Sequence, residues 1–152
     1  MAVREAVHRD PVWRARSNHL IAAEVQLDGT DIATEQLWAR RIGADQFELC
    51  CIPFFVYDLA LGDVVEVDDS SLVRSVLSPS GRYVFRVFFE RSNLVFRDEI
   101  VRGLESLQSI YEWSSASLLA VDARDEAHAS IVAEYLADGE RSGMLLYETG
   151  KS

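Results

Sequence analysis

The sequence contains very little cysteine, proline or glycine. Its 152 residues include 2 Cys, 3 Pro and 8 Gly, a composition that excludes collagen-like and low-complexity chains. The two cysteines, Cys50 and Cys51, are adjacent, and a disulfide between neighbours requires a strained geometry. There is no Cys-x-x-Cys motif, and no further Cys or His stands at zinc-ligand spacing. We therefore expect two free thiols, no metal and no cofactor.

Long apolar runs are also missing. The longest candidates, at residues 49–56 and 83–89, have the length of strands, whereas a membrane span needs ~18 apolar residues. The first ten residues, MAVREAVHRD, show neither the apolar core nor the small-residue cleavage pattern of a secretory signal. These absences predict a cytoplasmic protein.

The sequence lacks the common motifs of catalysis. Neither phosphate-binding pattern, G-x-G-x-x-G or G-x-x-x-x-G-K-[ST], occurs, and no serine stands in a G-x-S-x-G elbow. The histidines His8, His19 and His128 are scattered, and no pattern brings His19 or His128 close to a nucleophile. The sequence therefore predicts a protein that is not an enzyme.

Carboxylates are dense in one part of the first half. The group consists of Asp58, Asp63, Glu66, Asp68 and Asp69. Paired carboxylates can bind a hard cation or act as acid and base, but the D-x-D-x-D-G spacing of a calcium loop is missing. Asp is common in tight turns because it accepts hydrogen bonds from nearby amides. We favour turn acids, and an enzyme that uses these carboxylates stays an alternative that Asp63→Asn would test.

Acidic residues clearly outnumber basic ones. The chain has 25 Asp and Glu against 15 Lys and Arg, a formal charge of −10, and this field repels nucleic acids and anionic membranes. Residues 98–152 alone carry 11 acids and 4 bases. A solvated helix face is one reading, and a docking surface for a basic protein partner is the other. The candidate contact residues for such a partner are Asp68, Asp69, Asp122, Asp125, Glu126 and Asp138.

The first 80 residues read as an arm followed by short strands. Residues 1–17 are mostly polar with Trp13 as the one large apolar anchor, which predicts a loosely held N-terminal arm. Residues 18–80 form a β-rich half, with strands predicted at 19–27, 35–42, 47–52, 64–67 and 72–77. Strands at this spacing predict a small barrel or a strongly bent sheet.

Residues 81–150 show a different pattern. Strands are predicted at 83–89, 109–113, 117–121 and 144–148, with helices from about Asp98 and over 125–138, the second ending at Gly139. One long strand over 109–121 is the competing reading. The order β-α-β-β-α-β predicts a ferredoxin-like half, so the chain as a whole is α+β and forms one compact unit. The sheet face that carries Val84, Arg86 and Phe88 needs cover from the N-terminal strands or from a partner.

Four short motifs carry a resemblance to a known family. They are Leu37-Trp38-Ala39, Ile52-Pro53-Phe54-Phe55, Leu61-Gly62-Asp63-Val64-Val65 and Ser80-Gly81, in this order. On these motifs the chain resembles a bacterial family called domain of unknown function 4265, over residues 35–148. The resemblance implies a bacterial protein with a similar fold, but no activity and no catalytic residue.

Two functions fit these observations. The first is a non-enzymatic protein-binding module, most concretely an immunity-type inhibitor that covers the active site of a basic toxin enzyme. The second is a small-molecule-sensing regulatory domain that dimerises through its ferredoxin-like sheet. The sequence does not choose an oligomeric state.

Overall fold

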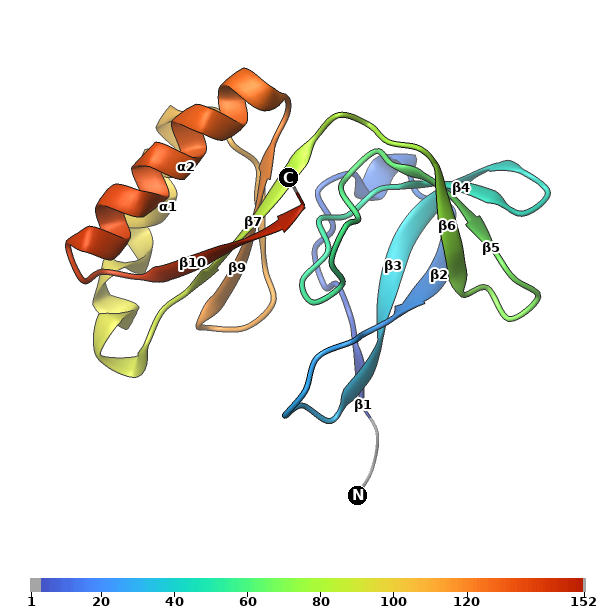
Figure 1. The fold of residues 1–152 in the computed structure, drawn as a ribbon, viewed down its shortest axis with the longest axis horizontal. Helices are drawn as coiled ribbons and strands as arrows, with labels where there is room; N and C mark the ends of the chain where they lie inside the picture. The colour runs from blue at the N-terminus through green and yellow to red at the C-terminus, as the bar shows by residue number, and fades with distance from the viewer. Residues whose placement is uncertain (1–3, 152) are drawn as a thin grey trace.

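The computed structural model describes residues 4–151 as two halves, each with its own sheet (Figure 1). The N-terminal half contains β1 (Arg4–Ala6), β2 (His19–Glu24), β3 (Ile32–Gly43), β4 (Gln46–Leu49), β5 (Val64–Val67) and β6 (Val73–Ser78), with a short 3-10 helix, η1 (Arg14–Arg16), before β2. The sheet order is β1-β3-β4-β5-β6, and β2 also pairs with β3. The long strand β3 is therefore the centre of this half.

The N-terminal sheet does not close into a barrel. Its two ends approach each other at a single bridge between Ala22 and Leu72, where the Ala22 amide donates to the Ser71 carbonyl at 3.0 Å. A closed barrel requires a continuous ladder of hydrogen bonds around its circumference. The barrel alternative from the sequence is therefore wrong, and the half is an open sheet.

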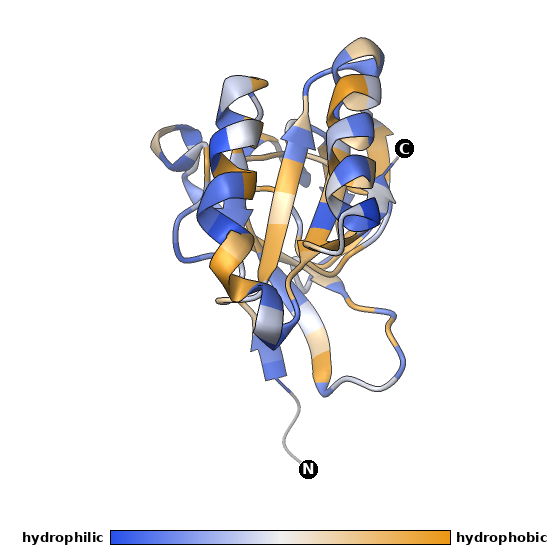
Figure 2. Cartoon of the chain, turned by 90° about the vertical axis from the view of Figure 1, so that its left-hand side faces the viewer, coloured by the Kyte–Doolittle hydropathy of each residue, from blue (hydrophilic) through white to orange (hydrophobic). Residues whose placement is uncertain are grey.

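The C-terminal half combines four strands with two helices. The strands are β7 (Tyr83–Phe88), β8 (Tyr111–Trp113), β9 (Leu118–Ala123) and β10 (Leu146–Lys151), in the order β10-β7-β9-β8 with every pair antiparallel. A 3-10 segment, η2 (Arg91–Phe96), leads into α1 (Arg97–Ser106), and α2 is Glu126–Arg141. Figure 2 looks onto these helices, which lie side by side over the sheet. The predicted α+β class is confirmed, and residues 109–121 form two strands.

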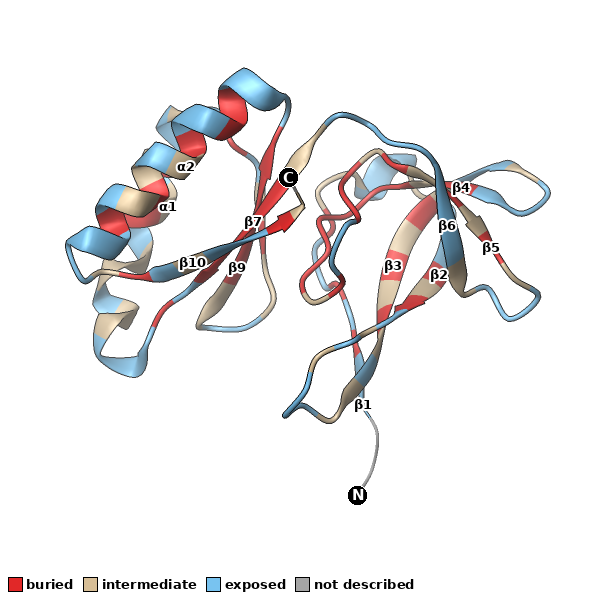
Figure 3. Ribbon diagram, in the orientation of Figure 1, coloured by how far each residue is buried: buried red, intermediate tan, exposed pale blue. Residues whose placement is uncertain are grey.

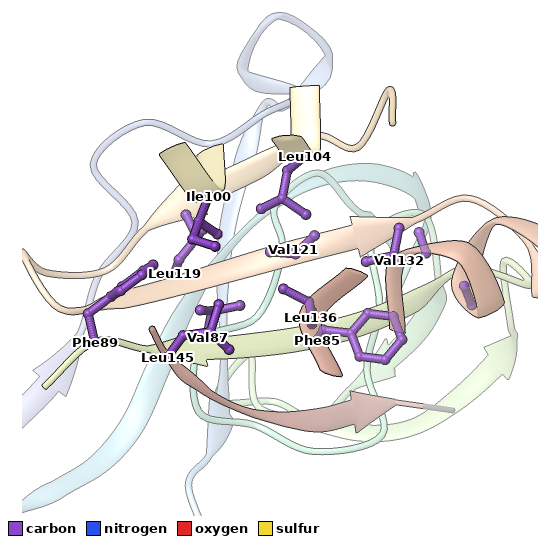
Figure 4. Packing of buried hydrophobic residues seen from close by; sticks show 12 residues of the cluster. Phe85, Val87, Phe89, Ile100, Leu104, Leu119, Val121, Val132, Leu136 and Leu145 are labelled. Carbon is purple, nitrogen blue, oxygen red and sulfur yellow. The ribbon is translucent and has the colours of Figure 1, made fainter. Parts of the chain in front are cut away.

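The helices cover their face of the sheet with the largest apolar cluster. Alternate residues of the β7 segment point into it, because successive side chains of a strand face opposite sides. Figure 4 shows these side chains between the sheet and the two helices. The buried members are Phe85, Val87, Phe89, Ile100, Leu104, Leu119, Val121, Ala123, Ala129, Val132, Leu136 and Leu145.

The other face of the C-terminal sheet packs against the loop that follows β4. Val84 of β7 and Ala120 of β9 are fully buried against Ile52, Phe54 and Leu61. Figure 3 shows this loop as a buried segment between the two sheets. The cover predicted for this face thus comes from a loop of the N-terminal half and not from its strands. Phe88, at the end of β7, stays 44% exposed.

Residues 4–17 are held to the rest of the fold at several points, so the expectation of a loosely held arm is wrong for them. β1 pairs in parallel with β3, and the Trp13 amide donates to the Cys50 carbonyl at 3.1 Å. The side chain of His8 is completely buried. The sequence argument counted apolar anchors only, whereas the main attachment here is a polar side chain with charged partners. Residues 1–3 lie outside the described part of the chain.

Helix α2 does not end at Gly139 as the sequence suggested. It continues to Arg141, and Gly143, with φ of +73°, follows it. Gly139 faces the core, where a Cβ would lie 2.9 Å from Cδ2 of Leu145. This glycine is required for the close approach of the helix to Leu145 and not for a change of backbone direction.

Gly103 should be a position in α1 that does not tolerate a side chain. A Cβ at this residue would overlap the hydroxyl and ring of Tyr135 on α2. Gly103→Ala should therefore lower the free energy of unfolding by about 1–3 kcal/mol through overpacking. In a Tyr135→Ala background the clash is gone, and the same change should raise stability by about 1 kcal/mol through helix propensity. Urea denaturation of the four proteins measures both effects, and a loss that persists without Tyr135 would contradict this account.

Candidate functional site

A histidine held between two glutamates lies at the junction of the halves. His8 Nε2 is 2.6 Å from Oε2 of Glu35, and His8 Nδ1 is 2.7 Å from Oε1 of Glu112. The ring of Phe54 stacks on the imidazole at 3.9 Å between centroids. The exposed fractions of the His8, Glu35 and Glu112 side chains are 0%, 0% and 2%. We call these three residues the His8 cluster.

Backbone amides satisfy the remaining oxygen lone pairs of the His8 cluster. Glu35 accepts hydrogen bonds from the amides of Phe54, Phe55 and Val56 at 2.7, 2.8 and 3.0 Å. Glu112 accepts hydrogen bonds from the amides of Ile52 and Val12 at 2.6 and 3.4 Å. The loop over residues 52–56 is therefore folded around the two carboxylates. Pro53 keeps this segment out of the sheet, which leaves its amides free to turn toward them.

The His8 cluster joins elements that are far apart in the sequence. His8 follows β1, Glu35 lies in the first half of β3, and Glu112 lies in β8 of the other sheet. Glu35 is on the buried side of β3 together with Leu37 and Ala39. The cluster thus ties the N-terminal segment, both sheets and the intervening loop together.

The surroundings favour the charged forms of His8 and Glu35. Burial by itself lowers the pKa of His8, but the neighbouring Cys51 and the hydrogen bonds to Glu112 and Glu35 raise it well above its ordinary value. Burial by itself raises the pKa of Glu35, but His8 and the amides of Phe54 and Phe55 lower it. The result is a buried imidazolium fixed between carboxyl groups.

The two cysteines are buried neutral thiols. Burial raises the pKa of Cys50 to about 11, and the neighbouring Glu48 acts in the same direction. Burial also raises the pKa of Cys51, although His8 opposes this effect. A thiol of this kind is a poor nucleophile, because the thiolate is the reactive form. The structure brings Cys51 near His8, a pairing that the sequence argument did not consider.

The other two histidines do not assist the thiols. His19 is exposed and bonds to the Asn18 side chain at 2.7 Å. His128 is buried, with Nε2 2.8 Å from the Leu107 carbonyl and Nδ1 accepting the Arg124 amide at 3.1 Å. Both ring nitrogens of His128 are therefore used in holding α2 to its neighbours.

Neither a metal-binding group nor a membrane-spanning helix is found in residues 4–151. No three of their His, Cys, Asp or Glu side chains form a group that could hold a metal ion. In the His8 cluster both ring nitrogens are engaged with carboxylates and have no lone pair to offer a metal. None of the helices in this range is long and apolar enough to cross a membrane.

The carboxylates of the first half act in turns and an ion pair. Asp63 is buried, accepts the amides of Ala60 and Ser80 at 2.9 and 2.8 Å, and pairs with Lys151 at 2.7 Å. Asp68 accepts the amides of Ser70 and Leu72 in the β5–β6 turn. These bonds support the turn-acid reading of the carboxylate group.

One of the six predicted partner contacts is not at the surface. Asp122 is 1% exposed and binds Arg82 through both oxygens, at 2.9 and 2.7 Å. Burial raises the pKa of this carboxyl, and Arg82 opposes the shift. Asp122 therefore cannot meet a partner without unfolding the end of β9, and its assignment as a contact was wrong. The sequence placed Asp122 beside the second helix, but no local pattern indicated that Arg82 binds it.

The other five candidates are at least partly accessible but do not form one surface. Asp125, Glu126 and Asp138 lie on or beside α2, where Asp125 also caps the helix by accepting the His128 amide at 2.8 Å. Asp68 and Asp69 lie in the turn between β5 and β6, at the other end of the molecule (Figure 1). A single partner of modest size would contact one group or the other.

Comparison with solved structures shows a shared fold. The chain is similar to a structure described as "Novel crystal structure of a hypothetical protein from Neisseria gonorrhoeae", with a TM-score of 0.71 and 18% sequence identity. The alignment covers 88% of this chain and 96% of that chain. A comparison with curated proteins finds no match.

The family comparison covers most of both halves. A family described as "Domain of unknown function (DUF4265)" matches residues 35–147. The matched range contains Glu35, Glu112 and the loop at 52–56, whereas His8 precedes it. The match agrees with the four motifs noted in the sequence, because all four lie within the matched range. The chain therefore belongs to the DUF4265 family.

Proposed function

We propose that the protein is a non-enzymatic protein-binding module whose helical face docks a basic protein. The most concrete form of the proposal is an immunity-type inhibitor that covers the active site of a basic toxin enzyme. The observation that carries the proposal is the charge of the surface formed by α1 and α2. The groups best suited to acid and base chemistry, those of the His8 cluster, are out of reach of a substrate, which also favours binding over catalysis.

The helical face is acidic and has an apolar centre. Ile131 of α2 is 51% exposed, and Glu134 and Asp138 lie one and two turns further along the same side. The exposed acids of the two helices are Asp98, Glu99, Glu105, Glu126, Glu134, Asp138 and Glu140, and the exposed bases are Arg102 and Arg141. An apolar residue within a charged rim is typical of a protein interface. Complementary charge on a partner would raise the association rate.

Affinity capture at two salt concentrations tests the proposal. The tagged protein is used as bait in a lysate of its native strain, at low and at high salt. We expect one basic protein that is lost at high salt. The triple variant Glu126→Lys, Glu134→Lys and Asp138→Lys should not capture this protein. Its dissociation constant for the partner at low salt should be at least tenfold higher than that of the wild-type chain.

A matched variant separates the helical face from net charge. Glu24→Lys, Asp28→Lys and Asp45→Lys reverse three exposed acids of the N-terminal half and change the net charge by the same amount. This variant should retain the partner. Equal loss in both variants, or capture that is insensitive to salt, would contradict the proposal. If the captured protein is an enzyme, stoichiometric inhibition by the wild-type chain would support the inhibitor form.

We also infer a ferredoxin-like fold for the C-terminal half. The support is the strand order β10-β7-β9-β8 together with the connections, since α1 joins β7 to β8 across β9 and α2 joins β9 to β10 across β7. We place the protein in a bacterial cytoplasm, and the support is its pair of free buried thiols.

The sensing alternative loses its proposed dimer surface. A second copy would have to pack on the sheet face that carries Val84, Arg86 and Ala120, which are 0%, 4% and 0% exposed beneath the loop from residue 52 onward. We therefore do not propose dimerisation through this face.

A further inference from the structure

Two adjoining cavities meet at Phe88, on the sheet face opposite the helices. One has a volume of about 250 Å³ and is lined by Arg86, Leu146 and Glu148 among others. The second has a volume of about 550 Å³ and lies against Val7 and Phe55. Phe88 and Leu118 line both cavities. We call the combined space the Phe88 groove.

The walls of the Phe88 groove expose apolar surface. Phe88, Leu146 and Val7 are 44%, 47% and 46% exposed. Phe88 is the register partner of both Leu146 and Leu118, so these three side chains are neighbours on one face of the sheet. A cluster of exposed large apolar residues of this kind marks a binding surface.

A buried arginine lies at one end of the groove with unused donors. Arg86 is 4% exposed, and its Nη2 donates to the Val56 carbonyl. Among the described residues, no group accepts a hydrogen bond from Nε or Nη1 of Arg86. Buried guanidinium donors are normally paired, and carboxylate is their preferred partner.

Glu148 covers this arginine without satisfying it. Its carboxylate is 3.8 Å from Nη1 of Arg86, beyond hydrogen-bond distance, and it accepts the Tyr57 hydroxyl at 2.8 Å. The Glu148 side chain is 53% exposed, so it can rotate away at little cost. A ligand carboxylate could then occupy the position next to the guanidinium.

We propose that the Phe88 groove binds a small anionic amphiphile. The carboxylate of the ligand accepts hydrogen bonds from Arg86 after Glu148 has rotated outward, and its apolar chain lies on Phe88 and Leu146 toward the larger cavity. The far end of the groove is lined by Arg4, Glu5 and Arg9, and Arg4 is paired with Asp31 at 2.9 Å, so Arg9 is the residue there that can attract an anion. The groove lies on the other side of the sheet from the helical face, so this inference does not depend on the protein-binding proposal.

Titration calorimetry with decanoate, below its micelle-forming concentration, tests the ligand class. We expect saturable binding with one site per chain, and binding of decanol at least tenfold weaker because it lacks the carboxylate. Glu148→Gln keeps an acceptor for Tyr57 but removes a competing negative charge, so it should tighten decanoate binding several-fold. Absence of saturable decanoate binding to the wild-type chain, or equal affinity for decanol, would overturn the proposal.

Matched substitutions locate the site. Leu146→Glu should weaken decanoate binding at least tenfold, whereas Ile131→Glu, at a residue of similar exposure on α2, should leave it unchanged. Arg86→Met should reduce the affinity for decanoate to that for decanol. Arg86 also binds the Val56 carbonyl, so this variant could fail to fold. In that case the Glu148→Gln and Leu146→Glu variants test whether decanoate binds in the groove. Equal losses in the Leu146 and Ile131 variants would show that decanoate binds elsewhere.

Discussion

His8→Ala should lower the free energy of unfolding by about 3–5 kcal/mol, because it leaves buried carboxyl groups without their cation. In the native protein His8 is the shared partner of Glu35 and Glu112, at 2.6 and 2.7 Å. The substitution also opens a space under the stacked ring of Phe54. Domains of this size have a total stability of about 5–15 kcal/mol, so the loss would be a large share of the whole.

Urea denaturation at neutral pH measures the effect of His8→Ala. His19→Ala is the matched control, because it removes the same side chain from an exposed position and should change stability by no more than about 0.5 kcal/mol. The two variants have the same composition and the same formal charge. Equal and small losses in both would show that the His8 cluster does not hold the halves together.

Local patterns in the sequence were sufficient for most of the regular elements, although β1 was missed. The strand predicted at residues 64–67 is β5, and the strand predicted at 83–89 differs from β7 only at its last residue. Alternation of apolar side chains and turn residues acts over a few positions, so these features could be read without knowledge of the fold. Helix α2 was predicted too short because Gly139 looks the same in sequence whether it ends a helix or packs closely inside one.

The His8 cluster could not be predicted from local patterns. His8 and Glu35 are 27 positions apart, and His8 and Glu112 are 104 positions apart. One signal was present: Glu35 shares the alternation of Leu37 and Ala39, which places a carboxylate on the buried side of a strand. That signal implies a buried cation somewhere, but its identity depends on the tertiary fold.

The distribution of charged residues along the sequence was misleading, because ion pairing also depends on the tertiary fold. Glu35, Asp63 and Asp122 count toward the formal charge of −10, yet all three are buried and paired inside the molecule. Arg82 pairs with Asp122, and Lys151 pairs with Asp63. The composition therefore identifies an acidic protein, whereas only the structure shows which acids can attract a partner.

The stability of the protein should fall as the pH rises above 6.5, the ordinary pKa of histidine. The pKa of His8 is raised in the folded protein, so between 6.5 and that higher value only the folded state holds the proton. Its stabilisation is complete below pH 6.5 and is lost as the pH rises through the folded pKa, by up to about 1.4 kcal/mol per pH unit. Glu35 acts in the opposite sense, because its lowered pKa gives stability that is lost at acid pH.

Free energies of unfolding measured from about pH 6 to about pH 8.5 test this assignment, because this range begins near the ordinary histidine pKa of about 6.5. The wild-type chain and His19→Ala should lose stability steadily over this range, whereas His8→Ala should show a smaller loss that is confined to the acid end, where its unpaired buried carboxyls give up their protons. Cys50, whose pKa is raised from 9.0 to about 11, adds a further loss only above pH 9.0 and so does not obscure the result. A slope of undiminished size in His8→Ala above about pH 7 would mean that a group other than His8 carries the proton. A slope above about pH 7 that is lost in His8→Ala and kept in His19→Ala would show that the folded state binds its extra proton on the His8 imidazole.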